Sequence, residues 1–409
     1  MTMQLAKRMS AVKASEIREI LKVTMRPEVI SFAGGLPAPE LFPTAELSRL
    51  AAKLIAERGA RALQYSTTEG DPALRAAIAE RSNRKWGTAL NPDEIMITTG
   101  SQQGLDLVGK LFLDEGDVVL CESPTYLGAI SAWNVFRPRW VEVATDDEGM
   151  IPEALERALA TTERVKLVYG IPNFQNPTGR SWSLVRRQQV LEILARHDVP
   201  FIDDNPYGEV RFEGHHLPGM QALVEAAGPV LTLGTFSKVL CPGLRIAWIA
   251  GPRALLEKLV ILKQGADLHT STLDQMLVAA YLEAEDLEAN LAKINAAYRI
   301  RRDAMLGALE REMPAGVSWT RPQGGLFLWL VFPEGVDARA LLKASLAHDV
   351  AFVPGGAFFP NGGHENTARL NFSNMPPHLI EEGIRRLARS LGGAARRAPA
   401  IEASSAAVC

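Results

Sequence analysis

The chain has few cysteines and no grouped metal ligands. Its 409 residues include only Cys121, Cys241 and Cys409, which lie far apart and form no CxxC or Cys/His pattern. Such spacing indicates neither a disulfide framework nor a zinc site, so we expect no metal. Unpaired cysteines are typical of a reducing compartment, and the predicted location is therefore cytoplasmic.

Long apolar runs and an excess of charge of one sign are also absent. No run reaches the roughly 18 to 20 apolar residues that a membrane span needs, and the N-terminus lacks the apolar core of a secretory signal. The net charge is −3 and the isoelectric point is about 6.2. We therefore expect neither nucleic acid nor a membrane as a partner.

What is present is the composition of a globular protein of one large domain with a satellite, or of two domains. Hydrophobic residues make up 47% of the chain and charged residues 22%, which allows a sizeable core. From residue 90 onward, short β-branched runs alternate with helical patterns, which predicts an α/β fold with a mostly parallel sheet between layers of helices. The seven expected strands are Ile95–Thr98, Asp117–Cys121, Trp140–Val143, Lys166–Tyr169, Pro200–Asp203, Val230–Leu233 and Arg245–Ala250.

The pattern changes after about Thr272. Residues 273–310 read as one long helix, suited to linking two domains, and the segments beyond it are typical of a smaller α+β domain. The tail consists of small residues without periodicity and is predicted to be disordered. The expected parts are an N-terminal arm (1–43), a large domain (44–290), a small domain with part of the arm (291–391) and the tail (392–409).

Polar residues gather where five of the expected strands end. Ligands of open α/β sheets bind at the carboxyl ends of the strands, so these five clusters are expected to converge on one cleft. The clusters are residues 99–101, 122–126, 172–176, 203–207 and 234–245.

An anion site is predicted at the first cluster. Gly100, Ser101 and Gln102 lie at a strand-to-helix turn, where free backbone N–H groups and a hydroxyl can bind an anion. Taken alone, Ser101 is better explained as a helix cap. The chain contains no GxxxxGK[ST] motif, so a nucleoside-triphosphate loop is not indicated.

The segment TFSKVLCPGLR (235–245) places one amine among two hydroxyls and a guanidinium. Arg245 can bind a phosphate in bidentate form, and Thr235 and Ser237 add hydroxyl donors. Lys238 has apolar neighbours, which suits a lowered pKa and Schiff-base chemistry. A solvated surface charge is the equally weighted alternative.

The segment DDNPY (203–207) carries a carboxylate at the end of a buried strand. Asp204 is costly there unless it pairs with a cation, and a protonated pyridine nitrogen is such a cation. Tyr207 and the amide of Asn176 could then hydrogen-bond an oxygen on the same ring. Asp204 and Asn176 also lie in good turn sequences, so turn formation is the competing interpretation.

Two further residues could bind parts of a ligand, one a ring and the other a carboxylate. Tyr126 can stack on a ring, although taken alone an ordinary half-buried aromatic is the better interpretation. Arg369 lies in the alternating sequence ENTARLNFS, and a guanidinium fixed on a strand can bind a carboxylate in bidentate form. Without further context, a solvent-facing arginine is the default.

Together these motifs resemble the fold-type I pyridoxal-phosphate aminotransferases, in particular the 2-aminoadipate and kynurenine aminotransferase-like group. The similarity runs from about Ile17 to Leu391. Departures from the family pattern are Thr235 and Cys241, where serine is frequent, and Asn205 within DDNPY. The motifs that occur in the family's order are SFAGGLPAPELFP (31–43), LQYSTTEGDPALR (63–75), TTGSQQGLDLV (98–108), PNFQNPTG (172–179), DDNPY (203–207), TFSKVLCPGLR (235–245) and RLNFS (369–373).

The resemblance implies a role for each predicted cofactor-site residue. Lys238 would form the internal aldimine with pyridoxal 5′-phosphate and move the proton between Cα and C4′. Asp204 would pair with the pyridine nitrogen, Tyr207 and Asn176 would address the phenolate oxygen, and Tyr126 would stack on the ring. The phosphate would be held by Gly100, Ser101, Gln102, Thr235, Ser237, Arg245 and, from a neighbouring subunit, Tyr65.

The resemblance also implies a substrate site and a partner. Arg369, helped by Asn176 and the backbone near Gly34 and Gly35, would bind the α-carboxylate. An early mobile helix of the arm would act as a lid, in which Arg18 either meets a distal carboxylate or lies on a solvated face. Because the family's sites are shared between subunits, a homodimer is implied.

The expected activity is ping-pong transamination between an α-amino acid and a 2-oxo acid such as 2-oxoglutarate. The donor would be glutamate-like or 2-aminoadipate, aromatic or aliphatic. A pyridoxal-phosphate lyase or decarboxylase on the same scaffold is one alternative. A transcription regulator with an aminotransferase-like domain is another, but only about thirty residues precede GGLP, too few for a winged helix.

Overall fold

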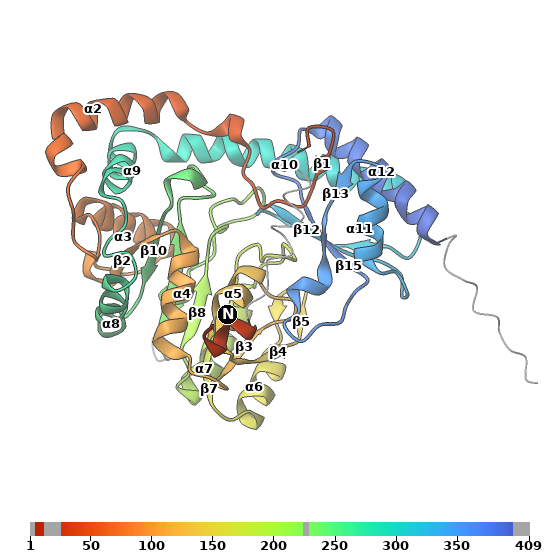
Figure 1. The fold of residues 1–409 in the computed structure, drawn as a ribbon, viewed down its shortest axis with the longest axis horizontal. Helices are drawn as coiled ribbons and strands as arrows, with labels where there is room; N and C mark the ends of the chain where they lie inside the picture. Colours follow the sequence, from red (N-terminus) through yellow and green to blue (C-terminus); the bar gives the residue numbers. More distant parts are fainter. Residues whose placement is uncertain (1–4, 12–25, 224–228, 396–409) are drawn as a thin grey trace, which may run out of the picture.

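A seven-stranded mixed sheet forms the centre of the molecule (Figure 1). The computed structural model describes residues 5–11, 26–223 and 229–395. The strand order is β2-β10-β9-β8-β7-β3-β4, and β10 alone is antiparallel to its neighbours in this sheet. The strands are β2 (Ile95–Thr99), β3 (Val118–Glu122), β4 (Arg139–Val143), β7 (Val165–Gly170), β8 (Phe201–Asp204), β9 (Val230–Thr235) and β10 (Ile246–Ala250). All seven predicted strands are confirmed, with ends that differ by at most two residues.

Helices cover both faces of this sheet because alternate strand residues point to opposite sides. Met96 and Val119 join a core with α4, α5 and α8, whereas Ile97 and Val118 belong to separate cores on the other face. There, α2, α3 and α9 cover β2 and β10, and α6 and α7 cover β3 and β7. The helices are α2 (Thr44–Ala62), α3 (Pro72–Trp86), α4 (Ser101–Phe112), α5 (Leu127–Trp133), α6 (Pro152–Thr161), α7 (Leu184–His197), α8 (Arg253–Gln264) and α9 (Thr272–Ala284).

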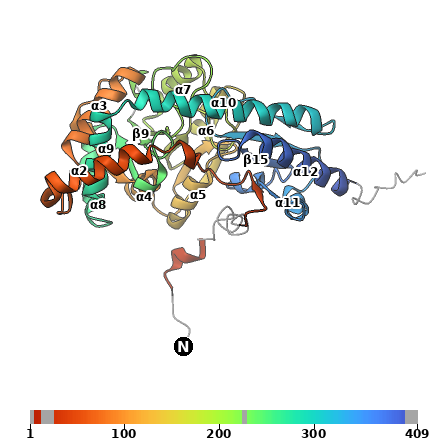
Figure 2. The ribbon, with the colours of Figure 1, turned by 90° about the horizontal axis from the view of Figure 1, so that it is seen from above.

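The single helix predicted over residues 273–310 is wrong, because the chain forms two helices there. Two residues separate the end of α9 from the start of α10 (Leu287–Glu312). Asp286 makes the break, since its carboxylate accepts a hydrogen bond from the N–H of Ala289 and so caps α10. Figures 1 and 2 show α10 running from the helices of the large sheet to α12 (Pro377–Ala395), so that α10 links the two parts of the molecule.

The C-terminal part is a smaller layer of sheet and helices. Its four-stranded antiparallel sheet has the order β11-β12-β15-β14. The N-terminal segment joins this part, because β1 pairs in parallel with β13. The elements are β1 (Ile30–Ser31), β11 (Ser318–Trp319), β12 (Phe327–Val331), α11 (Ala338–Leu346), β13 (Val350–Ala351), β14 (Val353–Pro354), β15 (Thr367–Asn371) and α12 (Pro377–Ala395), and a hairpin of β5 (Thr145–Asp146) and β6 (Gly149–Met150) flanks the large sheet.

The C-terminal helix is longer than the sequence suggests. The predicted tail begins at Gly392, yet α12 continues through Gly392 and Gly393 to Ala395. Glycine costs only about 1 kcal/mol in a helix interior, which a helix already packed along its length tolerates. Residues 396–409 lie outside the described part of the chain.

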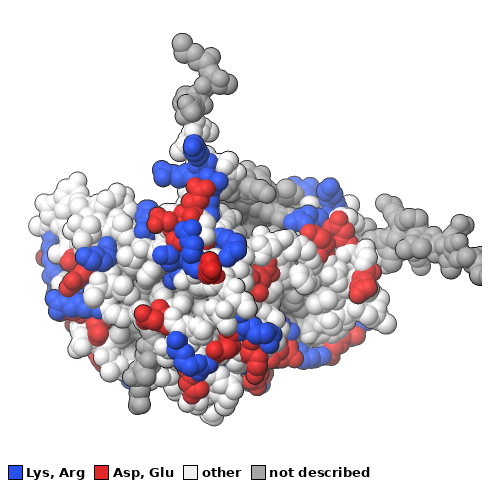
Figure 3. Space-filling view, turned by 90° about the horizontal axis from the view of Figure 1, so that it is seen from below, with Lys and Arg blue, Asp and Glu red and all other residues white. Residues whose placement is uncertain are grey.

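Charges of both signs are mixed on the surface. Figure 3 shows one face on which Lys and Arg side chains are interspersed with Asp and Glu. Within the described residues, no helix is long and apolar enough to cross a bilayer. The same residues contain no group of three or more His, Cys, Asp or Glu side chains that could hold a metal ion.

Candidate active site

A cavity of about 300 Å³ lies at the carboxyl ends of β7, β8 and β9, between the large sheet and the small domain. Its lining draws on all five polar clusters, together with β12, β15 and the N-terminal segment. Parallel strands place their carboxyl ends at one edge, which is why clusters far apart in sequence meet there. The predicted residues in the lining are Gly35, Ser101, Gln102, Tyr126, Asn176, Asp204, Tyr207, Thr235, Ser237, Lys238, Arg245 and Arg369.

Lys238 lines this cavity from the turn after β9. It is partly buried, and its Nζ donates a hydrogen bond to the carbonyl of Gly35 at 2.9 Å. Burial, and then the positive charges of Arg369 and Arg245, lower the pKa of the Lys238 ammonium to about 8. An amine of this kind becomes a nucleophile close to neutral pH, unlike a fully solvated lysine.

Asp204 is buried at the end of β8. Its Oδ2 accepts a hydrogen bond of 2.7 Å from the hydroxyl of Tyr169, and its Oδ1 is buried without a partner among the described residues. Burial raises the pKa of Asp204 to about 7; the Tyr169 bond opposes this and the charge of Asp203 adds to it. The carboxylate therefore has one oxygen available for a cationic ligand group. Among the described residues, it accepts no hydrogen bond from the N–H groups of the turn that follows.

The predicted anion site is a cup of hydroxyls and a guanidinium. Ser101 is the first residue of α4 and not its cap, and its buried Oγ makes no hydrogen bond among the described residues. The Oγ1 of Thr235 donates to the Oγ of Ser237 at 2.9 Å. Gly100 has φ of 78°, and a Cβ there would lie 2.1 Å from the Nη2 of Arg245, so glycine allows the guanidinium to reach the turn.

Gln102 and Tyr126 lie on the side of the cavity formed by α4 and α5. The Nε2 of Gln102 donates to the carbonyl of Gly128 at 3.0 Å, which ties the two helices together. A Cβ on Gly128 would lie 2.3 Å from the ring of Tyr126, so this glycine leaves room for the ring. Tyr126 is partly buried and faces the cavity as the residue before α5.

Asn176 connects the two sides of the cavity. Its Nδ2 donates to the hydroxyl of Tyr207 at 3.3 Å, and its Oδ1 accepts a bond of 2.9 Å from the Nη1 of Arg369. Tyr207 packs edge-on against Phe327, with 5.8 Å between ring centroids. Burial raises the pKa of Tyr207 above its ordinary value, so its hydroxyl is a hydrogen-bond donor at neutral pH.

Arg369 is buried on β15, so the default of a solvent-facing arginine is wrong. Its Nη2 donates to the carbonyl of Ala33 at 2.7 Å, while its Nε has no partner among the described residues. The guanidinium carbon lies 4.2 Å from the ring centroid of Phe327 and 5.1 Å from that of Phe358. Burial lowers the pKa of Arg369 to about 10, so the guanidinium stays charged at neutral pH, and no carboxylate of the described residues pairs with it.

Of the predicted residues that the structure describes, Gly100, Tyr65 and Gly34 are not in the cavity lining. Tyr65 is 79% exposed and packs edge-on against His269, with 5.7 Å between ring centroids. Gly34 is buried, and the carbonyl that reaches Arg369 belongs to its neighbour Ala33. Arg18 and the predicted lid helix lie outside the described residues.

Sequence reasoning missed Tyr169 and Phe327. A tyrosine near the end of a buried strand resembles an ordinary core residue, and so does a phenylalanine that begins a strand. Tyr169 stands out only once β7 and β8 are paired in parallel, since its hydroxyl then reaches Asp204. A prediction that β7 pairs with β8 could therefore have identified Tyr169 as a neighbour of Asp204.

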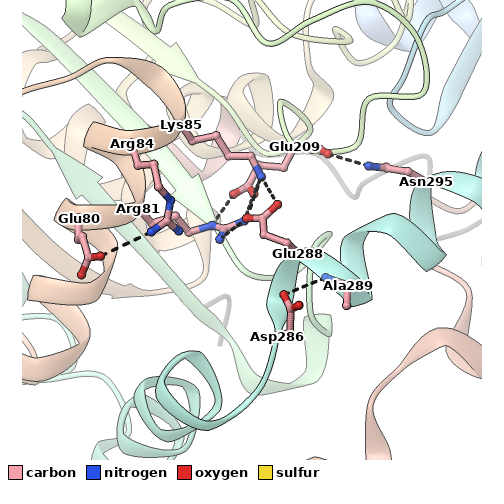
Figure 4. Close-up of polar contacts among 9 residues, drawn as sticks. All are labelled: Glu80, Arg81, Arg84, Lys85, Glu209, Asp286, Glu288, Ala289 and Asn295. Atoms are coloured by element: carbon pink, nitrogen blue, oxygen red, sulfur yellow. Dashed lines mark hydrogen bonds and ion pairs between the residues drawn. The ribbon is translucent and has the colours of Figure 1, made fainter.

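A buried ion network anchors the segment after β8 (Figure 4). Glu209 pairs with both Arg81 and Lys85 of α3, and the Nζ of Lys85 lies 2.8 Å from its Oε2. The same two cations pair with Glu288 in the first turn of α10, and the Nδ2 of Asn295 donates to the carbonyl of Glu209 at 3.2 Å. The network ties this segment to α3 and α10.

The unsatisfied groups of the cavity match a phosphorylated pyridine aldehyde. The free Oγ of Ser101 and the guanidinium of Arg245 suit a phosphate, and the free Oδ1 of Asp204 suits a protonated ring nitrogen. The amine of Lys238 suits the aldehyde. The residues present therefore fit such a cofactor.

The chain matches the family model for class I and II aminotransferases over residues 36–387. It is 48% identical over 384 residues to a 2-aminoadipate transaminase of Thermus thermophilus, which covers 93% of this chain and 95% of that protein. It is 45% identical over 384 residues to aromatic-amino-acid aminotransferase 1 of Thermococcus litoralis, and the match covers 93% of this chain and 92% of that protein.

Solved structures show the same similarity. The chain superposes with a TM-score of 0.90 and 46% identity on an α-aminoadipate aminotransferase of Thermus thermophilus, over 96% of this chain and 98% of that one. That protein was crystallised with N-(5′-phosphopyridoxyl)-L-leucine.

Proposed function

We propose that this chain, which belongs to the class I and II aminotransferases and uses pyridoxal 5′-phosphate, transfers the amino group of a glutamate-like, aromatic or aliphatic amino acid to a 2-oxo acid. The observation that carries the proposal is the meeting of Lys238, Asp204 and Arg369 at one cavity. An amine, a carboxylate and a carboxylate-binding cation are the groups that such a transfer needs.

The proposed cofactor residues act through charge and hydrogen bonds. When bound, the cofactor supplies an aldehyde that links to amines and a ring that accepts electrons. Asp204 would hold the positive charge at the ring nitrogen, and Tyr207 and Asn176 would donate to the ring oxygen. Tyr126 would cover one face of the ring. The phosphate would be held by Gly100, Ser101, Gln102, Thr235, Ser237 and Arg245.

Lys238 has the properties of the residue that moves the proton. Its pKa of about 8 lets Nζ hold or release a proton near neutral pH. Its hydrogen bond to Gly35 directs the amine toward the N-terminal segment, on the side where the substrate would enter. Arg369, with Asn176 beside it, would bind the substrate α-carboxylate in the space between the two domains.

Named relatives guide the choice of donor. Proteins that are 45–48% identical to this chain are named for 2-aminoadipate and for aromatic amino acids, so we infer that this chain accepts donors of both kinds. A distal carboxylate would be met by Arg18 from a lid helix. Because both relatives are transaminases, a lyase or decarboxylase reaction is not favoured.

The proposal includes a homodimer in a reducing cytoplasm. Tyr65 is highly exposed although it lies in a family motif, which fits a role in a neighbouring subunit's phosphate cup. Leu63 beside it is 69% exposed, as expected for a surface that a partner covers. Cys121 and Cys241 are unpaired, in keeping with a reducing compartment.

Single-turnover absorbance measurements test the proposal. Mixing the holoprotein with 2-aminoadipate, glutamate or phenylalanine alone should convert the bound cofactor to its amine form, and 2-oxoglutarate should reverse the change. A lyase would release ammonia or carbon dioxide without any 2-oxo acid. If none of these donors changes the cofactor absorbance, the proposed function is contradicted.

A further inference from the structure

Glu122, the last residue of β3, is a buried carboxylate surrounded by hydrogen-bond donors. Its Oε1 accepts from the indole Nε1 of Trp182 at 2.9 Å. Its Oε2 accepts from the N–H of Ile171 at 2.9 Å and from the Nε2 of Gln175 at 3.4 Å. The residue is 1% exposed, and it forms no ion pair within the described part of the chain.

This arrangement of donors suits an ionised carboxylate. It does not suit a neutral group of the same shape, such as the protonated acid or a glutamine amide. Both oxygens face N–H donors, so a proton on either oxygen, or the amide of a glutamine, would place donor against donor. Burial raises the pKa of Glu122 to about 7, and these three donors and the charge of Arg180 oppose that rise. A buried carboxylate without a direct cation is tolerated because the three donors compensate it.

The donors belong to one loop that the carboxylate closes. Ile171 and Trp182 lie at the two ends of the loop after β7, so Glu122 binds both ends at once. Gln175 extends the contact toward the loop tip: its Nε2 donates to the carbonyl of Pro124 at 2.7 Å, and its Oε1 accepts from the N–H of Thr178 at 2.9 Å. The turn at residues 176–179 is thereby fixed to the β3 end.

That turn carries Asn176, which contacts both sides of the active site. Asn176 accepts from Arg369 and donates to Tyr207, so a shift of the loop would move the partner of the guanidinium. Glu122 itself does not line the cavity. Its effect on the reaction must pass through Asn176.

We propose that Glu122, as an ionised carboxylate, is a positioning residue for substrate binding, because it holds the Asn176 loop in the place where Arg369 can take a carboxylate. This inference rests on the proposed function, in which Arg369 binds the substrate. It adds a specific requirement: the hydrogen-bond pattern at residue 122, rather than burial alone, sets carboxylate affinity.

The test compares the wild-type holoprotein with Glu122→Gln. This substitution keeps the shape of the side chain and replaces one acceptor oxygen by an NH2 donor. The dissociation constants of two carboxylates without an amine, glutarate and 3-phenylpropanoate, are measured from the cofactor absorbance. For each of the two carboxylates that binds the wild type, the dissociation constant should be about tenfold or more higher in Glu122→Gln. The affinity for pyridoxal 5′-phosphate should change less than about threefold, because Asn176 is the one proposed cofactor contact on this loop and the residues proposed for the phosphate lie elsewhere.

Glu142→Gln is the matched control. Glu142 lies on the neighbouring strand β4. Its carboxylate accepts hydrogen bonds from the Oγ of Ser123 at 2.8 Å and from the N–H of Asn361 at 3.1 Å, and within the described part of the chain it makes no hydrogen bond to the loop at 171–182. Its substitution should leave carboxylate binding unchanged. If Glu122→Gln lowers the melting temperature but binds the carboxylate as the wild type does, Glu122 is only structural and the inference is overturned.

Two further outcomes are decisive. Should Glu122→Gln not fold, Trp182→Phe removes one donor and keeps a ring, and should raise the dissociation constant about threefold. An unchanged constant in Trp182→Phe then overturns the inference. A wild-type protein that binds no pyridoxal 5′-phosphate overturns the proposed function and this inference with it, whereas normal wild-type binding with unaffected variants overturns the inference alone.

Discussion

The ionisable side chains of the cavity owe their chemistry to burial. Lys238 and Arg369 have lowered pKa values of about 8 and about 10, and Asp204 has a raised pKa of about 7. Each shift has desolvation as its largest cause, which disfavours the charged form. An anionic substrate would stabilise the charged form of Arg369 and a cationic ring would stabilise that of Asp204, so ligands of those charges are the ones that the cavity favours.

Removal of the Tyr169 hydroxyl should shift the pH dependence of catalysis. The bond from Tyr169 stabilises the ionised form of Asp204, so Tyr169→Phe should raise the pKa of that carboxyl. The acid limb of the kcat/KM profile should move up by about one pH unit, since a bond to a charged group contributes about 1.5 kcal/mol or more. Tyr281→Phe, at a buried tyrosine of α9, should leave the profile in place. Identical profiles for Tyr169→Phe and wild type would refute this coupling.

The buried amine should destabilise the cofactor-free protein below about pH 8. The folded pKa of Lys238 is about 8 and its ordinary value is 10.5, so between these values the unfolded chain binds more protons and stability rises with pH. Relative to Lys238→Met, the wild type should be about 2 kcal/mol less stable at pH 7, after allowance for partial exposure. Urea unfolding from pH 7 to 10.5 measures the difference, which should shrink as pH rises. A difference that does not vary with pH would show that the amine is not desolvated.

At the scale of helices and strands, sequence patterns located most elements and missed particular breaks. The strands of the large sheet were predictable because buried parallel strands are short apolar runs between turn residues. The break between α9 and α10 was not, because apolar periodicity continues across it and only the side chain of Asp286 ends it. Tyr169 and the role of Phe327 depend on which strands and domains lie side by side, which a single sequence does not state.

The ion network between α3, α10 and the segment after β8 should contribute to stability through its buried member. Glu209→Gln leaves Arg81 and Lys85 with one carboxylate fewer in a site that is nearly closed to water, and should cost about 3 kcal/mol. Glu80→Gln, at an exposed pair with Arg84, should cost less than about 0.5 kcal/mol. Urea unfolding at pH 7 compares the two. Equal costs would mean that the network is no more than surface charge.

In the whole molecule, the proposed substrate site lies between the two parts that α10 links, and we expect a partner subunit beside it. The division at residue 290 falls in the first turn of α10 and stays a prediction, as does the dimer. The exposed Tyr65 would link the proposed dimer to the site, because the cavity of its own chain does not include it. The alternation of strand and helix patterns predicted the large sheet, whereas a single sequence does not state which surface a second chain covers.

Subunit mixing tests whether active sites are shared. Lys238→Ala should be inactive, and Tyr65→Ala should bind the cofactor weakly. In a mixed dimer, one site receives Lys238 from one chain and Tyr65 from the other, so mixing after mild dissociation should restore activity that neither variant has. Activity equal to the sum of the separate variants would contradict a shared site.

The most direct measurement of the central claim is borohydride reduction of the holoprotein, followed by peptide mass spectrometry. We expect reduction to fix one pyridoxyl phosphate group on the peptide that contains Lys238. Lys263, another buried lysine, should carry none because Asp267 and Gln103 already bind its ammonium. A reduced cofactor found on any other lysine, or on none, would show that Lys238 is not the residue that binds the cofactor aldehyde.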